Sequence, residues 1–286
     1  MKISIIIPTF NNLNYLKLFL SSIKKNSFYT EHEIILHIND GSDGTLEYAK
    51  NNKIKFSFSP KNIGLCSSMN KAYLLTTTNY ILYAHDDMYF CKNWDYFLIN
   101  EINSQKNNLF YLSGTNVSTR HGLINFDCGN NIQDFDEKKF EKFCMSDNTP
   151  DLQSSHWAPH LIHRELWDKI GGFSEEFNPG DGSDPDFCMK LWNENVRVFK
   201  AISKFKVYHF NSKTTRNSKV ILNNGTKTFL FKYGFNPRFF RKHYLRGNIS
   251  IIPYIGTLTN PNKNIRYYID LIKCKIKIFY YKIFNY

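Results

Sequence analysis

The chain has 286 residues, of which 42% are apolar and 16% are aromatic, so it is long enough for one large domain with an extension or for two domains. No residue class is depleted, which excludes a disordered chain. The net charge of +12 is unevenly placed, because residues 216–286 contain 14 Lys and Arg against one acid, whereas residues 1–215 contain 23 against 24. The nearly neutral body argues against a nucleic-acid-binding protein, and we expect no nucleic-acid partner.

Six cysteines are scattered along the chain without a CxxC or Cys/His ligand spacing. This distribution is typical of a reducing compartment and predicts neither disulfides nor a zinc site. The first apolar run covers only residues 3–7 before Pro8, which is not the pattern of a signal peptide. No uncharged apolar stretch approaches the roughly 18 residues that span a bilayer. We therefore expect a cytoplasmic protein.

The first hundred residues alternate short apolar runs with helical patterns. Residues 3–7 predict a buried parallel strand, and Asn11 or Asn12 would cap the next helix. Four apolar residues share one face of that helix: Leu13, Leu16, Leu20 and Ile23. Further strands are predicted at 33–38, 54–58 and 80–84, with a helix at 67–75. Strands that alternate with helices indicate right-handed crossovers and an α/β fold with a mostly parallel sheet.

Beyond residue 110 the pattern is harder to interpret. Residues 111–149 show no clear periodicity. Helices are predicted at 164–170 and from Asp184 or Pro185 to about residue 195, where Asp184 would be the cap and Pro185 the first helical residue. A strand is predicted at 205–208.

Polar clusters follow three of the predicted strands, at residues 8–11, 39–40 and 85–87. Ligands of open α/β sheets bind beyond the carboxyl ends of the strands, so these clusters predict one shared crevice. Asp86 and Asp87 are adjacent and repel each other, and a divalent cation bridging a diphosphate would compensate. A solvated turn is the alternative for this dipeptide alone.

Six sequence blocks, in order, resemble family 2 glycosyltransferases, which have the GT-A fold. The resemblance covers roughly residues 1–210. The blocks are Ser4–Asn11 (SIIIPTFN), Glu33–Thr45 (EIILHINDGSDGT), Asn62–Gly64 with Asn70–Ala72, His85–Asp87 at the place of the Asp-x-Asp motif, Gly171–Phe177 (GGFSEEF) and Asp184–Asp186. His85 departs from the motif, because the family often has an aspartate there, and this departure puts the ligand geometry in doubt. Asn39 likewise replaces a common acid.

The resemblance implies roles on the donor side. A nucleotide-sugar pocket would be lined by Pro8, Thr9, Phe10 and Asp40, with Gly64 and Asn70 near the ribose or diphosphate. Asp40 would accept hydrogen bonds from a uracil-like base, and a turn-forming aspartate is the alternative. For Gly64 and Asn70 the alternative is an ordinary helix start. Asp86 would contact the ribose or sugar, and Asp87 would ligate Mn²⁺ or Mg²⁺.

Asp184 is the candidate general base, because a sugar hydroxyl must lose a proton as it attacks the anomeric carbon. The family's base is an acid at this point of the motif, and Ser183 is a departure from the pattern. A residue that only caps its helix is the alternative for Asp184, and Asp181 and Asp186 are the other candidates for the base. Asp186 is assigned to acceptor binding.

His209 follows the last predicted strand, where some family members have a metal- or diphosphate-binding histidine, and a structural histidine is the alternative. Trp157 and His160 are acceptor-site candidates, with His156 nearby, because aromatic faces stack on sugar rings. A core role for Trp157 is the alternative.

Residues 265–283 predict an amphipathic helix. Its apolar stripe consists of Ile265, Tyr268, Ile269, Ile272, Ile276, Phe279 and Ile283, with lysines beside or behind it. The helix would lie on an anionic membrane, peripheral to its inner face, or the stripe would pack on the catalytic domain or on a second subunit. The basic, aromatic segment 225–247 could extend the acceptor cleft.

We therefore expect an inverting, metal-dependent glycosyltransferase that uses a nucleotide sugar, UDP by the resemblance, and a glycan or lipid-linked acceptor in polysaccharide or glycoconjugate synthesis. Residues 1–215 would form the GT-A catalytic domain, divided into a nucleotide-sugar half (1–110) and an acceptor half (111–215). Residues 216–286 would form a basic extension. One alternative is a sugar-nucleotide nucleotidyltransferase, although the chain lacks a Gly-rich phosphate loop with a basic residue after the first strand. A non-catalytic nucleic-acid-binding protein is the other.

Overall fold

The computed structural model describes residues 1–153, 158–211, 223–247 and 252–284. Within these ranges ten strands form one sheet in the order β3-β2-β1-β4-β9-β6-β10-β5, with β7 beside β6 and β8 beside β10. The strands are β1 (Ser4–Phe10), β2 (Glu33–Asn39), β3 (Lys55–Ser59), β4 (Tyr80–Tyr83), β5 (Met88–Phe90), β6 (Phe110–Ser118), β7 (Ile124–Asn125), β8 (Leu152–Gln153), β9 (His160–His163) and β10 (Val198–His209).

The sheet is mostly parallel, as predicted. Strands β3, β2, β1 and β4 are parallel, whereas β9, β5 and β8 run antiparallel to their partners. The register pairs Phe10 with Asn39 and Asn39 with Ser59, so β1, β2 and β3 end level with one another. The polar residues that follow these strands therefore share one edge of the sheet.

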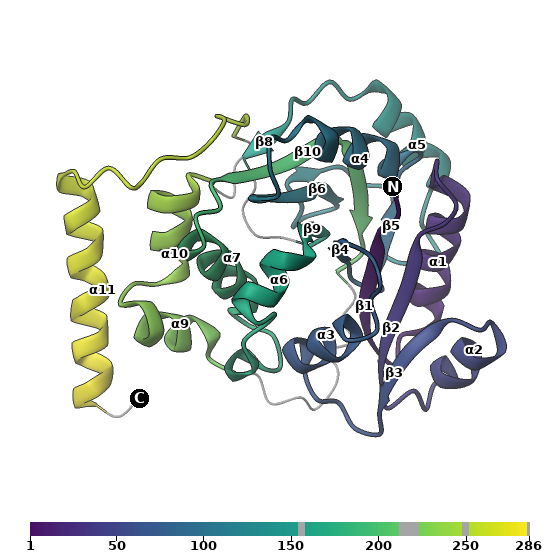
Figure 1. The fold of residues 1–286 in the computed structure, drawn as a ribbon, viewed down its shortest axis with the longest axis horizontal. Helices are drawn as coiled ribbons and strands as arrows, with labels where there is room; N and C mark the ends of the chain where they lie inside the picture. The colour runs from purple at the N-terminus through teal and green to yellow at the C-terminus, as the bar shows by residue number, and fades with distance from the viewer. Residues whose placement is uncertain (154–157, 212–222, 248–251, 285–286) are drawn as a thin grey trace.

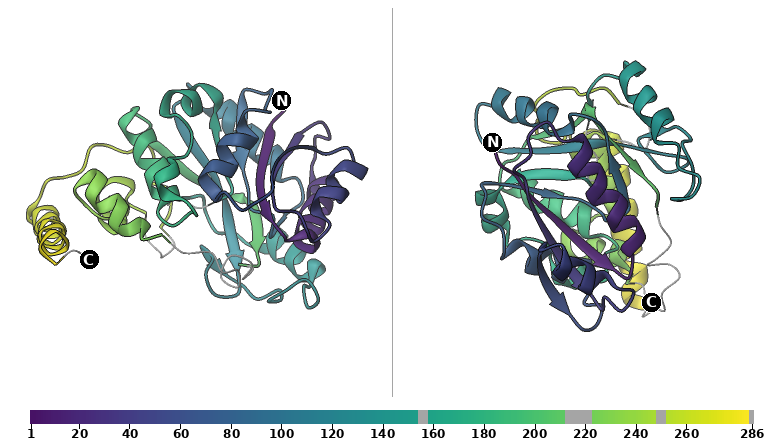
Figure 2. Two further views of the ribbon diagram at one scale, coloured as in Figure 1. Left: turned by 90° about the horizontal axis from the view of Figure 1, so that it is seen from below. Right: turned by 90° about the vertical axis from the view of Figure 1, so that its right-hand side faces the viewer.

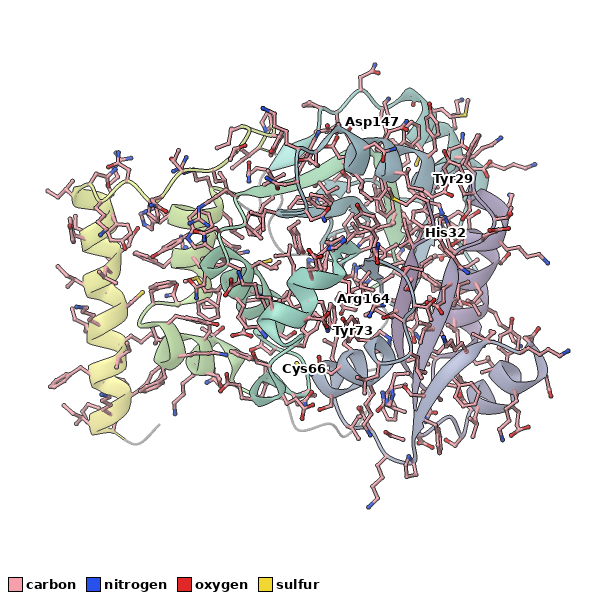
Figure 3. All side chains as sticks on the ribbon, in the orientation of Figure 1. Tyr29, His32, Cys66, Tyr73, Asp147 and Arg164 are labelled. Atoms are coloured by element: carbon pink, nitrogen blue, oxygen red, sulfur yellow. The ribbon has the colours of Figure 1, made fainter. Side chains whose placement is uncertain are left out.

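Helices surround the sheet in Figure 1, where α1 lies to the right of β1 and α3 to its left. They are α1 (Leu13–Asn26), α2 (Thr45–Asn51), α3 (Leu65–Tyr73), α4 (Trp94–Ser104), α5 (Glu137–Ser146), α6 (Arg164–Ile170), η1 (Glu175–Phe177), α7 (Ser183–Asn193), α9 (Gly225–Tyr233), α10 (Pro237–Phe240), η2 (Arg241–Leu245) and α11 (Ile265–Ile283). Side chains join neighbouring helices: Arg164 of α6 donates a hydrogen bond to the Tyr73 hydroxyl of α3 and stacks over its ring (Figure 3).

Two helix starts differ from the sequence prediction. Asn12 occupies the N-cap position of α1 without a capping hydrogen bond, and Asp43 accepts from the Leu13 amide instead. Helix α7 begins at Ser183, with Gly182 as its N-cap at φ +81°. Asp184 therefore lies inside the first turn and does not cap the helix, which leaves its carboxylate available for another role.

The C-terminal helices lie at one end of the molecule, with α11 outermost and α9 and α10 between it and the rest of the chain (Figures 1 and 2). Helix α11 covers the residues predicted for it. Among the described helices, none combines the length and apolar character needed to cross a membrane.

Candidate active site

A pocket of about 370 Å³ opens at the carboxyl ends of β1 and β4. The polar clusters after both strands line it, together with the start of α3, the loop before α7 and the end of β10. The lining residues are Pro8, Thr9, Phe10, Asn12, Asn39, Asn62, Gly64, Leu65, His85, Asp86, Asp87, Pro179, Gly180, Asp181, Ser183, Asp184, His209 and Asn211. The crevice predicted from the strand ends is thus a real cavity.

Asp87 and His209 are brought together by strand pairing. Strand β5 runs antiparallel to β10 with Met88 opposite His209, and the Phe210 amide donates to the Asp87 carbonyl oxygen. As a result His209 Nε2 lies 3.1 Å from Asp87 Oδ1. The other imidazole nitrogen, Nδ1, lies 3.2 Å from the Asn116 carboxamide nitrogen, which fixes the orientation of the ring.

His85 completes a cluster of possible metal ligands. One donor atom each from His85, Asp87 and His209 lies within 4.8 Å of the other two. The Tyr83 hydroxyl lies 2.7 Å from His85 Nε2, so Nδ1 is the nitrogen left to face the cluster. Burial and the neighbouring His209 lower the pKa of His85 to about 4, which keeps its imidazole neutral, as metal ligation requires. The residue that departs from the Asp-x-Asp pattern is therefore part of the site.

Asp86 also lines the pocket and is hydrogen-bonded to the segment that follows β1. Its Oδ1 accepts a 2.9 Å hydrogen bond from the carboxamide of Asn12. Burial and the adjacent Asp87 carboxylate raise the pKa of Asp86. The raised pKa means that a second uncompensated negative charge beside Asp87 is unfavourable.

Asp184 faces the cavity from the first turn of α7. Its Oδ1 is buried and has no hydrogen-bond partner among the described residues. Burial raises the pKa of Asp184 to about 7. A carboxylate with a raised pKa and a free oxygen is what a general base at neutral pH requires.

The loop before α7 is fastened on both sides. Asn178 Oδ1 accepts from the Cys66 amide at the start of α3, and a side chain at Gly64 (φ +84°) would collide with Asn178. On the other side, Asp181 Oδ2 accepts from the Gly225 amide of α9 at 2.9 Å. Gly182 and Gly225 lie backbone to backbone, so a side chain on either would meet the other segment.

Other predicted donor residues divide into two groups. Pro8, Thr9, Phe10 and Gly64 line the pocket. Asp40 is not among the lining residues and directly follows the lining residue Asn39; it has φ +63°, and a 2.9 Å hydrogen bond from Asn11 lowers its pKa.

The structure differs from the prediction at three residues. Asn70 is not at the pocket, because its carboxamide exchanges two hydrogen bonds with the Phe173 backbone. His160 is 1% exposed and packs among Tyr83, Tyr111 and Phe187, so it does not reach a ligand. Asp186 is fully buried.

Asp186 is held by four side chains, which explains why it cannot contact an acceptor. Ser174 and Tyr233 donate hydrogen bonds to its two oxygens, Lys232 lies at 2.8 Å and Lys190 at 3.9 Å. Trp157 and His156 lie outside the described residues.

Three carboxamides of the pocket were not predicted as site residues from the sequence. They belong to Asn12, Asn62 and Asn211. Asn39 belongs to one of the predicted clusters; its Oδ1 accepts from the Ile63 amide and its nitrogen donates to Ser68. Asn12 could have been found by its position, because it follows the first strand closely.

Comparison with solved structures identifies the fold class. The chain is similar to TarS of S. aureus (TM-score 0.55, 19% identity, 73% of this chain and 60% of that chain). It is also similar to GalNAc-T7, solved with UDP, GalNAc and Mn²⁺ (TM-score 0.56, 17% identity, 73% of this chain and 44% of that chain). A third similar structure is that of the mannosyltransferase PcManGT of Pyrobaculum calidifontis with GDP-Man and Mn²⁺ (TM-score 0.52, 14% identity, 74% of this chain and 57% of that chain). The fold is that of the GT-A glycosyltransferases.

Residues 4–165 match the model of glycosyl transferase family 2, and the chain belongs to this family. The chain spans about 60% of the TarS structure it resembles. No curated protein matches its sequence.

Proposed function

We propose that this chain transfers a sugar from a nucleotide sugar to a hydroxyl of a glycan or lipid-linked acceptor, with inversion, in polysaccharide or glycoconjugate synthesis. The observation that carries the proposal is one cavity with a His85–Asp87–His209 cluster and, on the wall formed by α7, the unpartnered carboxylate oxygen of Asp184. Family membership and the GT-A fold support it.

The donor in this proposal is a UDP sugar. Pro8, Thr9 and Phe10 would line the nucleoside end of the pocket, with Asp40 facing the base and Gly64 near the diphosphate. TarS and GalNAc-T7 were solved with uridine nucleotides, which supports UDP, whereas PcManGT was solved with GDP-Man. Asp86, polarised by Asn12, would contact the ribose or sugar hydroxyls.

The cluster residues fit a divalent cation, Mn²⁺ or Mg²⁺. His85, Asp87 and His209 offer two imidazole nitrogens and one carboxylate oxygen close enough to share one ion. When bound, the cation would neutralise the diphosphate leaving group. Tyr83 and Asn116 would hold the two imidazole rings in position from behind.

Asp184 would then act as the base of a single displacement. The acceptor hydroxyl gives its proton to Asp184 while its oxygen forms a bond to the anomeric carbon. The bond from that carbon to the diphosphate oxygen breaks on the opposite face, which inverts the anomeric configuration. No covalent enzyme intermediate is needed, and residues 1–215 would contain all of these groups.

The test is nucleotide release from a panel of UDP and GDP sugars, with the product anomer determined by NMR. Asp184→Asn should lower kcat by about 10²- to 10⁴-fold. Asp181→Asn is the matched control: Asp181 also lines the pocket, but its carboxylate is used by the Gly225 amide, and an asparagine keeps that acceptor. The proposal would be contradicted if the chain released nucleotide from none of these donors. Full activity in EDTA would contradict the proposed role of the divalent cation.

A further inference from the structure

Helix α11 has two apolar faces. Its inner face packs on the neighbouring helices: the Tyr267 ring lies 5.0 Å from Phe239, and Asp270 pairs with Lys242 at 2.6 Å and His243 at 3.0 Å. The opposite face, here called the outer stripe, is 46–76% exposed along its whole length. It consists of Ile265, Tyr268, Ile269, Ile272, Ile276, Phe279, Tyr280 and Ile283.

This geometry removes one of the alternatives left open by the sequence pattern, which is packing of the stripe on the catalytic domain. All seven residues of the predicted stripe face away from the chain, and the contacts with α9 and α10 use other residues. In Figures 1 and 2, α11 is the outermost element, and α9 and α10 lie between it and the rest of the described chain. An exposed apolar surface of this kind marks an interaction site.

The outer stripe has an ordered polarity across its width. At 100° per residue its members fall within an arc of about 120°. Isoleucines occupy the centre, and Tyr268 and Tyr280 occupy the two edges. Beyond one edge lie Arg266, Lys273 and Lys277, and beyond the other lie Lys275 and Lys282, all of them exposed. An apolar centre, tyrosines at the margins and cations outside them match the polarity gradient from acyl chains to anionic headgroups.

We propose that the outer stripe of α11 lies on an anionic lipid surface, with its isoleucines among the acyl chains and its flanking lysines on lipid phosphates. A second copy of the chain fits less well. Two stripes packed together would bring the five cations of each helix close to those of the other. The single acid of the helix, Asp270, is on the inner face and already paired.

The test is flotation of the full chain with vesicles of phosphatidylcholine alone or with about 30% phosphatidylglycerol. We expect binding to the anionic vesicles that weakens as salt is raised. Ile272→Ser/Ile276→Ser/Phe279→Ser should lower the binding constant at least about tenfold, because it removes buried apolar area. Lys273→Gln/Lys275→Gln/Lys277→Gln/Lys282→Gln should lower it by a similar or larger factor on anionic vesicles only.

The matched control is Leu74→Ser/Leu109→Ser/Met145→Ser, which removes three exposed apolar side chains from other surfaces and should bind as the unchanged chain does. Circular dichroism and Tm should be the same for all variants, since every substituted side chain is exposed. Nucleotide release with a water-soluble acceptor should also be unchanged, which separates this proposal from the proposed activity.

Two outcomes would overturn the proposal. One is equal flotation of the unchanged chain and the serine variant, or no flotation of either. The other is a dimer in lipid-free solution, seen by sedimentation, that the serine variant converts to a monomer, because the stripe would then be covered by a second copy.

Discussion

Asp87 Oδ1 lies 3.1 Å from His209 Nε2, although one residue follows β4 and the other ends β10. The pair exists because the short strand β5, immediately after Asp87, runs antiparallel to β10. Strand pairing, rather than a local motif, therefore sets the distance between two groups that we propose as metal ligands.

The cluster should bind Mn²⁺ more tightly than Mg²⁺, because Mg²⁺ prefers an all-oxygen octahedral set and two of the three groups here are imidazoles. His85→Ala and His209→Ala should each lower the Mn²⁺ affinity by about 100-fold or more, and Tyr83→Phe by about 10-fold or more. Titration followed by Mn²⁺ EPR measures this without any turnover. His121→Ala, an exposed histidine elsewhere, is the control. Unchanged affinity in His85→Ala would exclude that residue from the cluster.

The pH profile should follow Asp184. Its pKa is raised to about 7, and the base must be deprotonated to accept a proton. The rate should therefore be low below pH 6, rise through about pH 7 and reach a plateau above it. Asp184→Asn should remove this ascending limb along with most of the activity. A limb that persists in Asp184→Asn would show that another group is the base.

The same substitution should stabilise the fold at alkaline pH. A carboxyl whose pKa is higher in the folded than in the unfolded chain destabilises the folded state as pH rises from about 4 through about 7. Asp184→Asn removes this effect, so its free energy of unfolding at pH 8 should exceed that of the unchanged chain by roughly 2 kcal/mol, after allowance for water in the pocket. At pH 4 the two should unfold at nearly the same urea concentration, and a gain of the same size at both pH values would contradict this origin.

Gly64 should tolerate no side chain. Gly64→Ala would combine a positive φ with a collision against Asn178, so we expect a loss of about 1–3 kcal/mol in unfolding free energy and a higher donor KM. Gly234→Ala is the matched control, because Gly234 has a similar φ of +77° with no described atom within 4 Å of the added methyl group. Equal losses in the two variants would mean that the collision contributes nothing.

Asp186 should behave as a structural residue. Asp186→Ala would leave Lys232 and Tyr233 without their buried partner and should cost about 3–5 kcal/mol. Glu176→Ala removes the exposed partner of the same Lys232 and should cost at most about 1 kcal/mol. A rise in acceptor KM with little loss of stability in Asp186→Asn would instead restore the acceptor role.

Much of the fold could be predicted because its strands are short, continuous apolar runs separated by helical patterns. Strand β6 could not, since polar residues such as Ser113, Thr115 and Asn116 are buried within it and hide the pattern. Strand β10 was predicted only at its end, because it contains lysines and a register shift between Ile202 and Lys206.

Site residues could be predicted from the sequence where a polar side chain directly follows a strand, as at Asp87. They could not be predicted where contacts between residues distant in the sequence determine what a side chain binds. Asn70 belongs to a block that resembles the family, yet its carboxamide is used by Phe173, far along the chain. The departure of His85 from the motif put the ligand geometry in doubt, because His209, 124 positions along the chain, becomes its neighbour only in the folded sheet.

The attachment of the loop before α7 has a consequence for protein engineering. Asp181 and Gly182 are fastened to Gly225, and Asp186, one half-turn beyond Asp184, is held by Lys232 and Tyr233. A chimera that joins the body of this chain to another tail should therefore retain α9 and cross over at Gly234, where the helix ends. A junction near residue 215 would separate the helix that carries Asp184 from the segment that holds it in place.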